Sequence, residues 1–171
     1  MGGPVWQPDG GVIAGALLFD GIDDYVSTGP VLSPAGPEVA SGFSVIAWIK
    51  GGAPGQAVLS QTDAENWLCI DSVEGHLMTE LQTSGRVAPG PLLSQTVITD
   101  GHWHRIALVW DGSYRHLYVD GTEVAKDAAP LASLEGAAGS LCFGAGSTLV
   151  PGTFFSGLID DVRIYNRVVS P

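Results

Sequence analysis

Positively charged side chains are scarce in this sequence, and their scarcity limits what the protein can bind. Only 7 of the 171 residues are Lys or Arg, against 18 Asp and Glu, so the formal net charge is −11 at pH 7. Nucleic-acid-binding proteins use basic side chains to neutralise phosphates, so we expect no nucleic-acid partner. The same charge disfavours docking on anionic membranes and is compatible with the binding of cations.

Long apolar runs and cysteines are also few. The longest apolar run, Val12 to Phe19, contains Gly15 and is too short to span a bilayer, so we expect no membrane insertion. The chain opens Met1-Gly2-Gly3-Pro4 without the basic region of a signal peptide. Two cysteines do not make a disulfide framework. Cys69 and Cys142 both lie in apolar runs, which favours two buried free thiols over a disulfide.

Catalytic signatures are missing as well. The sequence has no Gly-x-Ser-x-Gly elbow, and neither cysteine lies near a histidine in a recognisable motif. Glycosidases built on a β-sandwich carry two carboxylates on one strand face, one acting as nucleophile and one as acid. Here the glutamates are scattered over the chain without such spacing. The sequence therefore predicts a protein that is not an enzyme.

Short strand-like segments separated by turn residues fill the chain instead, as its 24 Gly and 11 Pro suggest. The segments are 13–19, 25–26, 43–50, 57–60, 67–71, 76–81, 101–112, 114–121, 122–125, 140–143 and 158–165. Residues 1–11 are predicted to be coil, and no amphipathic helix is evident. The pattern predicts one all-β domain over residues 1–171, a two-sheet antiparallel β-sandwich or jelly roll. The predicted core includes Phe43, Trp48, Trp103, Leu108, Tyr118, Val162 and Ile164.

Five stretches resemble, in the same order, the motifs of a known family. They are Ala16–Gly21 with Asp23–Val26, the Trp-bearing strand Phe43–Lys50, Gly101–Val109, Leu117–Gly121, and Gly157–Arg167. Together they resemble laminin-G-like domains of the concanavalin A-like lectin superfamily. The resemblance implies a two-sheet jelly roll and a module of a larger secreted or surface protein. It therefore implies an extracellular or cell-surface location, with a glycan or an extracellular protein as the partner.

The beginning of the chain departs from that family. Its members usually start with a further strand before the Gly-rich lead-in, and residues 1–11 correspond to the lead-in alone. A sheet edge without that strand would be left unpaired, and such edges recruit other chains. We therefore predict one of two outcomes, a dimer through the open edge or an edge occupied by residues near Val5 and Trp6.

Four aspartates are candidate ligands of a metal ion, three near the start of the chain and one near its end: Asp20, Asp23, Asp24 and Asp160. Asp160 shares the strand phase of the apolar Val162 and Ile164, where an unpaired carboxylate would be costly. Its partner could be an arginine, backbone N–H groups or a metal ion. The resemblance implies that the first and last strands meet, so we predict that the four aspartates converge on calcium. The alternative is that they cap turns and accept backbone hydrogen bonds.

Tryptophans and histidines are the other candidates for binding. Trp67 follows a polar loop and is the better candidate for an exposed platform under a sugar ring, although core packing is the default for such a residue. Trp48 and Trp103 lie in apolar strands and are predicted to be core. His102 and His104 share a strand face, but no third zinc ligand is evident, so a hydrogen-bonded histidine is favoured at His104.

These features predict a non-catalytic, lectin-like binding module with a structural calcium ion. Two alternatives remain open at this point. One is a purely structural or adhesive spacer domain without a small-molecule site. The other is a glycoside hydrolase of the same fold, which the missing carboxylate pair disfavours.

Overall fold

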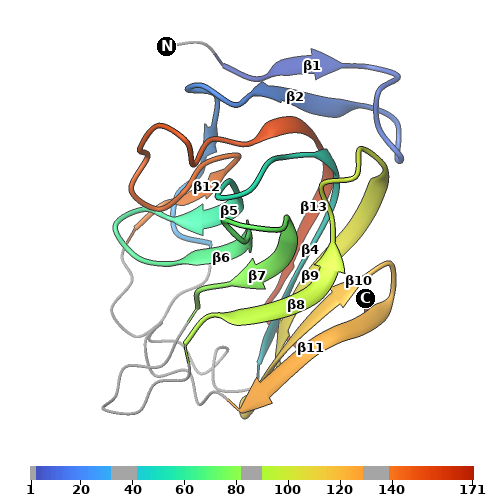
Figure 1. The fold of residues 1–171 in the computed structure, drawn as a ribbon, viewed down its shortest axis with the longest axis vertical. Coiled ribbons are helices and arrows are strands. Elements are labelled where there is room, and N and C mark those ends of the chain that lie inside the picture. Colours follow the sequence, from blue (N-terminus) through green and yellow to red (C-terminus); the bar gives the residue numbers. More distant parts are fainter. Residues whose placement is uncertain (1–2, 32–41, 82–89, 129–138) are drawn as a thin grey trace.

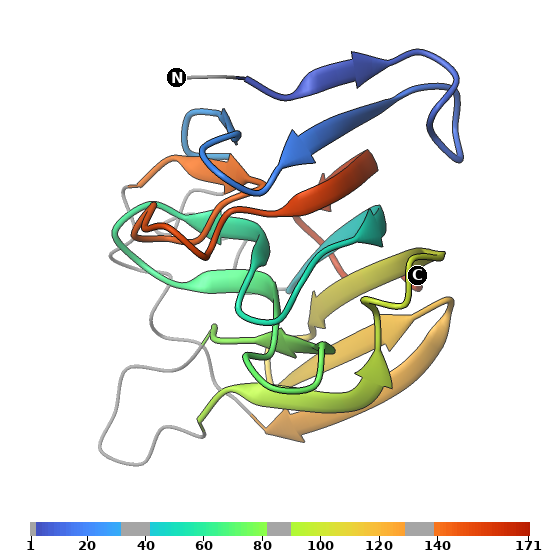
Figure 2. The ribbon, with the colours of Figure 1, turned by 45° about the horizontal axis from the view of Figure 1, so that its top comes forward.

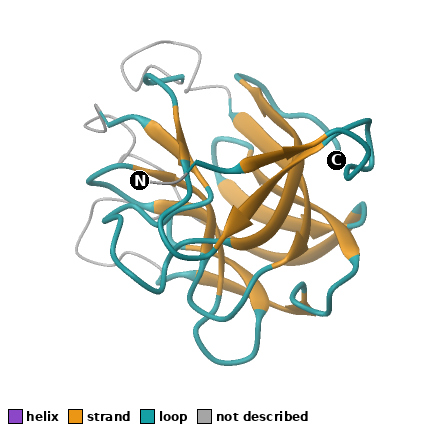
Figure 3. Cartoon of the chain, turned by 90° about the horizontal axis from the view of Figure 1, so that it is seen from above, coloured by secondary structure: helices purple, strands orange, loops and turns teal. Residues whose placement is uncertain are grey.

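A computed structural model of the chain describes residues 3–31, 42–81, 90–128 and 139–171. Within these ranges all regular structure is β-strand, and no helix there is long and apolar enough to cross a membrane. The strands form two antiparallel sheets that pack face to face, which confirms the predicted two-sheet sandwich (Figure 1, Figure 3).

The larger sheet has seven strands in the order β1-β2-β13-β4-β9-β10-β11. Their bounds are β1 Val5–Gln7, β2 Ala16–Asp20, β13 Ser156–Tyr165, β4 Phe43–Gly51, β9 Trp103–Trp110, β10 Tyr114–Val119 and β11 Thr122–Ala128. The final strand β13 lies between β2 and β4, so the two ends of the sequence meet in this sheet.

The smaller sheet has six strands in the order β3-β12-β5-β6-β7-β8. Their bounds are β3 Val26–Ser27, β12 Leu141–Phe143, β5 Ala57–Gln61, β6 Asn66–Ile70, β7 His76–Thr79 and β8 Leu92–Val97. The core lies between the two sheets and is built by alternate residues of each strand, because side chains of a strand point to its two faces in turn. In β4, for example, Val45, Ala47 and Ile49 face the smaller sheet and are fully buried.

The N-terminal edge differs from the prediction of coil for residues 1–11. Val5–Gln7 form β1, which pairs with β2 and so occupies its edge (Figure 2). Of the two predicted outcomes, the structure shows the edge occupied by Val5 and Trp6. The segment is flanked by Pro4 and Pro8, which lack the N–H needed to extend the ladder, and this is why the strand is only three residues long.

The predicted core is right in part. Phe43 and Leu108 are fully buried, and Val162 and Ile164 are partly buried against the core. Trp48, Trp103 and Tyr118 are only half-buried, because their strand phase places them on the outer face of the seven-stranded sheet. Cys69 and Cys142 are buried free thiols, as predicted.

Candidate functional site

Three of the four predicted metal ligands lie together in the loop that follows β2. One carboxylate oxygen from each of Asp20, Asp23 and Asp24 lies within 4.8 Å of the other two. Asp20 Oδ1 accepts a hydrogen bond from the Ile22 N–H (2.8 Å), and Asp24 Oδ2 accepts one from the Asp20 N–H (3.1 Å). Gly21 has φ of +77°, a conformation that side chains disfavour, and this turns the chain back so that the carboxylates face one another.

Asp160 does not join this cluster, so the prediction that four aspartates converge is wrong. Asp20 pairs with Ser156 at the start of β13, and Asp160 lies four residues further along that strand. At the rise of a β-strand, Asp160 is therefore about 13 Å from Ser156. Asp160 Oδ2 instead accepts hydrogen bonds from the N–H groups of Val12 and Ile13, both at 2.8 Å. Its partners are therefore backbone donors, and they hold the β1–β2 loop against β13.

A β-bulge explains why the strand phase of Asp160 was misleading. Asp160 pairs with Trp48 and Arg163 pairs with Ile46, so three steps along β13 match two steps along β4. The extra residue reverses the phase of the strand, and Asp161 takes a left-handed φ of 44° within it. Asp160 therefore lies on the outer face of the seven-stranded sheet, whereas Ile164 beyond the bulge packs against the core.

The outer face of the seven-stranded sheet carries two tryptophans that the sequence analysis assigned to the core. Trp48 on β4 pairs with Arg105 on β9, and Lys50 pairs with Trp103, so the two indoles are diagonal neighbours on adjacent strands. Diagonal neighbours are about 7–8 Å apart, within reach of aromatic side chains. The signal was present in the sequence, because Trp48 shares its strand phase with Lys50 and not with Val45 or Ile49.

Two chain segments flank this outer face. On one side, Asp160 holds the loop that carries Val12 and Ile13. On the other, Ser44 Oγ donates a hydrogen bond to the Arg167 carbonyl and accepts one from the Val169 N–H, both at 2.9 Å. Both anchored segments therefore lie against the same outer face as Trp48 and Trp103.

Trp67 is not an exposed platform, contrary to the prediction. Its side chain is 1% exposed and packs against Phe43, with ring centroids 5.5 Å apart. The polar loop before it ends at Asn66, whose side-chain oxygen accepts a hydrogen bond from the Ser147 N–H and whose amide donates to Glu80. The polar groups are therefore satisfied at the strand end, and the indole turns inward.

His104 is a hydrogen-bonded histidine, as favoured. Its Nδ1 lies 2.9 Å from Asp120 Oδ2, and its Nε2 lies 3.1 Å from Asp100 Oδ1. Burial alone would lower the pKa of His104, but the hydrogen bonds with Asp120 and Asp100 outweigh it and the pKa is raised. The backbone N–H of His102, together with the two histidine rings, lowers the pKa of Asp100 to about 2. The carboxylate is therefore ionised wherever His104 titrates.

Raising the pH should weaken the fold through His104. A histidine whose pKa is raised by folding stabilises the protein fully below its unfolded pKa of about 6.5, and the contribution is lost as the pH rises through the folded value. We expect the melting temperature of the wild type to fall above about pH 6.5, and His104→Gln to reduce that slope. His102→Gln, whose side chain is 81% exposed, is the control. A slope that is the same in His104→Gln and wild type would contradict the assignment.

Comparison with known proteins gives a family match and several similar folds. Residues 20–171 match the family model described as the concanavalin A-like lectin/glucanases superfamily. The binding domain of Paraclostridial Mosquitocidal Protein 1 is similar in fold, with a TM-score of 0.74 at 12% identity over 97% of this chain and 43% of that chain. Domain 4 of AbnA, an extracellular arabinanase from Geobacillus stearothermophilus solved with arabinotriose, is also similar in fold. Its TM-score is 0.58 at 20% identity, over 96% of this chain and 76% of that chain. Domains LG4-5 of the mouse laminin alpha1 chain have a TM-score of 0.61 at 14% identity, over 89% of this chain and 43% of that chain.

Proposed function

The chain belongs to the concanavalin A-like lectin/glucanase superfamily, and from that membership we propose that it is a non-catalytic module that binds a glycan. The observation that carries the proposal is the pair Trp48 and Trp103 on the outer face of the seven-stranded sheet. The flat apolar faces of sugar rings stack on aromatic side chains, and the hydroxyl groups need hydrogen-bonding partners beside them. Lys50 and Arg105, in the same two cross-strand pairs, supply such donors.

The same face supports binding over hydrolysis. Glycoside hydrolysis by the usual route needs two carboxyl groups on either side of the scissile bond. Trp48 and Lys50 on β4 have cross-strand partners on β9 and β13. Among these partners, Asp160 is the residue that carries a carboxylate. Asp160 Oδ2 already accepts two backbone hydrogen bonds, which suits a structural anchor better than a nucleophile or an acid.

The similar structures support a ligand of this class. The arabinanase domain was solved with arabinotriose, and the mosquitocidal protein domain is a binding domain. The arabinanase is extracellular, and we extend that location to this chain as part of the proposal.

Calcium is the second part of the proposal, now with three ligands in place of four. Asp20, Asp23 and Asp24 bring three carboxylates together, and no Lys or Arg precedes Lys50 in the sequence to balance them. Calcium takes six to eight oxygen ligands, so backbone carbonyls and water would complete the shell. A bound cation would offset the mutual repulsion of the carboxylates and stiffen the turn between β2 and β3.

A glycan array is the direct test of the binding function. We expect the wild type to bind a defined subset of glycans, and Trp48→Ala or Trp103→Ala to weaken that binding by at least about tenfold, equivalent to about 1.4 kcal/mol. Tyr114→Ala is the matched control, since Tyr114 is an exposed aromatic residue at the start of β10. If the folded wild type binds no glycan on the array, the proposal is wrong and a structural spacer is the better description.

Calcium should raise the melting temperature if the acidic loop binds it. For a dissociation constant of about 1 mM, 10 mM calcium stabilises the fold by about 1.4 kcal/mol, which corresponds to roughly 3–6 °C for a domain of this size. Asp23→Asn should abolish the increment, because it removes the charge of one of the three clustered carboxylates. Glu74→Gln, an exposed carboxylate elsewhere, is the control. An increment that survives in Asp23→Asn would refute this site.

A further inference from the structure

Exposed apolar side chains are concentrated on the β1–β2 hairpin. Of the 13 large hydrophobic residues that are exposed in the described ranges, five belong to the β1–β2 hairpin: Val5, Trp6, Val12, Ile13 and Leu18. Scattered exposed apolar residues are ordinary, but a group on one element marks an interaction surface. Val12 and Ile13 lie beside the outer face that carries Trp48, whereas Trp6 lines a cavity between the sheets and is separate from the proposed glycan site.

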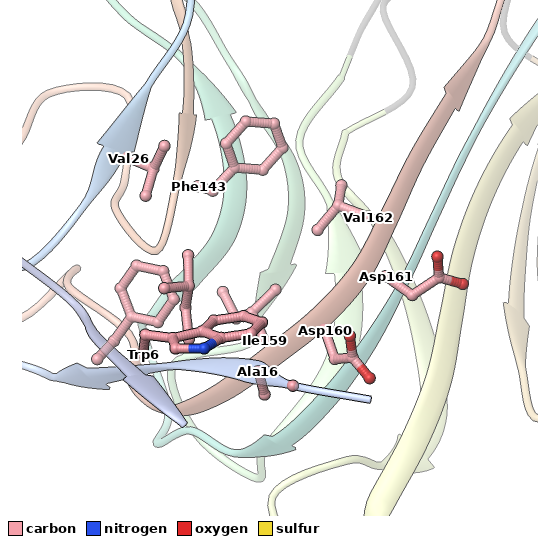
Figure 4. A pocket seen from close by; sticks show the side chains of 11 residues that line it. Trp6, Ala16, Val26, Phe143, Ile159, Asp160, Asp161 and Val162 are labelled. Carbon is pink, nitrogen blue, oxygen red and sulfur yellow. The ribbon is translucent and has the colours of Figure 1, made fainter. Parts of the chain in front are cut away.

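A cavity of about 340 Å³ opens beside this hairpin, between the two sheets (Figure 4). Its lining is largely apolar and comes from both sheets, with Leu17, Phe19 and Ile159 on one side and Val26 and Phe143 on the other. The volume lies at the small end of the range for ligand pockets, about 300–1,000 Å³. In Figure 4 the carboxylate groups of Asp160 and Asp161 point away from Trp6, so the space between the sheets suits an apolar group.

Trp6 stands at this cavity and is held in place by a glycine. A Cβ on Gly15 would lie 2.3 Å from Cζ2 and Cη2 of Trp6, so the indole packs directly on the backbone of that residue. The side chain nevertheless remains 59% exposed. An aromatic ring that is fixed on one side and open on the other is a ready contact surface, since little side-chain freedom is lost on binding.

The backbone of β1 is an available edge. It is the outermost strand of the seven-stranded sheet, and it carries no charged residue that would prevent another strand from pairing. Pro4 and Pro8 limit such pairing to Val5–Gln7. The hairpin exposes Trp6 on one face and Val5 with Leu18 on the other. A strand added at this edge would touch both faces, because its side chains alternate.

Charge indicates the composition of the segment that fits. The first 49 residues contain five Asp or Glu and no Lys or Arg. Asp9 follows β1 in sequence, and Asp20 lies beyond the other end, since Leu18 pairs with Val5. Carboxylates thus flank the edge strand at both ends. Basic side chains on either side of an apolar centre would complement them.

We propose that β1 and the cavity beside Trp6 form a docking site for an extended segment of another protein. The segment adds to the sheet next to β1, inserts one large apolar side chain into the cavity, and places Lys or Arg near Asp9 and Asp20. Because the paired region is short, the inserted side chain carries most of the specificity and the main-chain hydrogen bonds carry less. The site is independent of the glycan-binding function, and calcium bound by Asp20 would weaken only the contact that the basic residue at that end makes.

A displayed library of random nine-residue peptides, selected on the intact chain, tests the proposal. We expect the selected peptides to share a large apolar residue flanked by Lys or Arg. Trp6→Ala should weaken the best synthetic peptide by at least about tenfold, as expected of an aromatic anchor. Val26→Phe fills the cavity from the other sheet without touching β1 and should cause the same loss. Ile22→Ala, which removes an exposed apolar residue outside the cavity lining, is the matched control.

Variants of the selected peptide test the two features of the proposed segment, its apolar centre and its basic flanks. Replacing the apolar residue of the peptide by Asp should abolish binding, and replacing its basic residues by Glu should weaken it. A selection that yields no peptide dependent on both Trp6 and Val26 would overturn the docking site. Self-association in sedimentation that disappears in Trp6→Ala would mean that the occupant is a second copy of this chain. Glycan binding should be unchanged in Trp6→Ala. A failure of the docking proposal therefore does not count against the proposed glycan site.

Discussion

Replacing Arg115 with Ala should remove about 3–5 kcal/mol from the free energy of unfolding. Arg115 is one of only seven basic residues, and its side chain is completely buried between the sheets. Its Nε donates to Asp127 Oδ1 at 2.8 Å, and one terminal nitrogen donates to Asp127 Oδ2. The terminal nitrogens also donate to the carbonyls of Leu81 and Gly90. Truncation would leave a carboxylate without its partner and two carbonyls without donors, and unpaired buried polar groups are expensive.

The position of Arg115 explains why the loss should be global. Arg115 and Asp127 belong to the β10–β11 hairpin of the larger sheet, whereas Leu81 follows β7 and Gly90 precedes β8 of the smaller one. One guanidinium therefore joins the two sheets. At about 2–4 °C per kcal/mol, the melting temperature should fall by roughly 6–20 °C.

Urea denaturation of matched variants measures the effect of Arg115. Arg163→Ala is the control, because Arg163 also pairs with an aspartate but is exposed, and exposed pairs contribute about 0–1 kcal/mol. Arg115→Lys should fall between the wild type and Arg115→Ala, since an ammonium keeps the charge but loses the planar fork. If Arg115→Ala costs no more than Arg163→Ala, the contacts between the sheets contribute little.

The positions of most strands along the chain could be predicted because their apolar residues alternate or run together, and two exceptions show the limit of that signal. In β8 the buried positions are Leu92 and Ser94, whereas Leu93 and Val97 are exposed. The apolar and buried residues of this strand do not coincide, so periodicity gave no strand there. In β1 three residues between prolines are too few to show a period, and their pairing with β2 is a tertiary effect.

The candidate site shows the same limit. The clustering of Asp20, Asp23 and Asp24 could be predicted because they are close in sequence and a glycine turn brings them together. The place of Asp160 could not be predicted, because a bulge changes which face a residue occupies and nothing in the strand composition marks the extra residue. Trp48 could have been placed by comparing phases within its own strand.

Replacing Trp67 with Ala should destabilise the fold by about 3–5 kcal/mol, the usual range for removing a buried Trp or Phe side chain. Trp67 is among the largest fully buried side chains, and it belongs to the same core cluster as Phe43 and Leu68. The cavity left behind would not close, because the strands on both sides are fixed by their ladders. Glycan binding should persist at temperatures where the variant is folded, since the side chain does not reach the surface.

A second substitution at Trp67 separates packing from polarity. The indole N–H is buried and has no hydrogen-bond acceptor within the described residues, and such a group costs about 1–3 kcal/mol. Trp67→Phe keeps most of the apolar volume and removes that donor, so its loss should be much smaller than that of Trp67→Ala. Thermal and urea unfolding of both variants give the comparison. If Trp67→Ala left stability unchanged and reduced sugar binding, the indole would be a surface platform after all, and the inward orientation seen in β6 would be wrong.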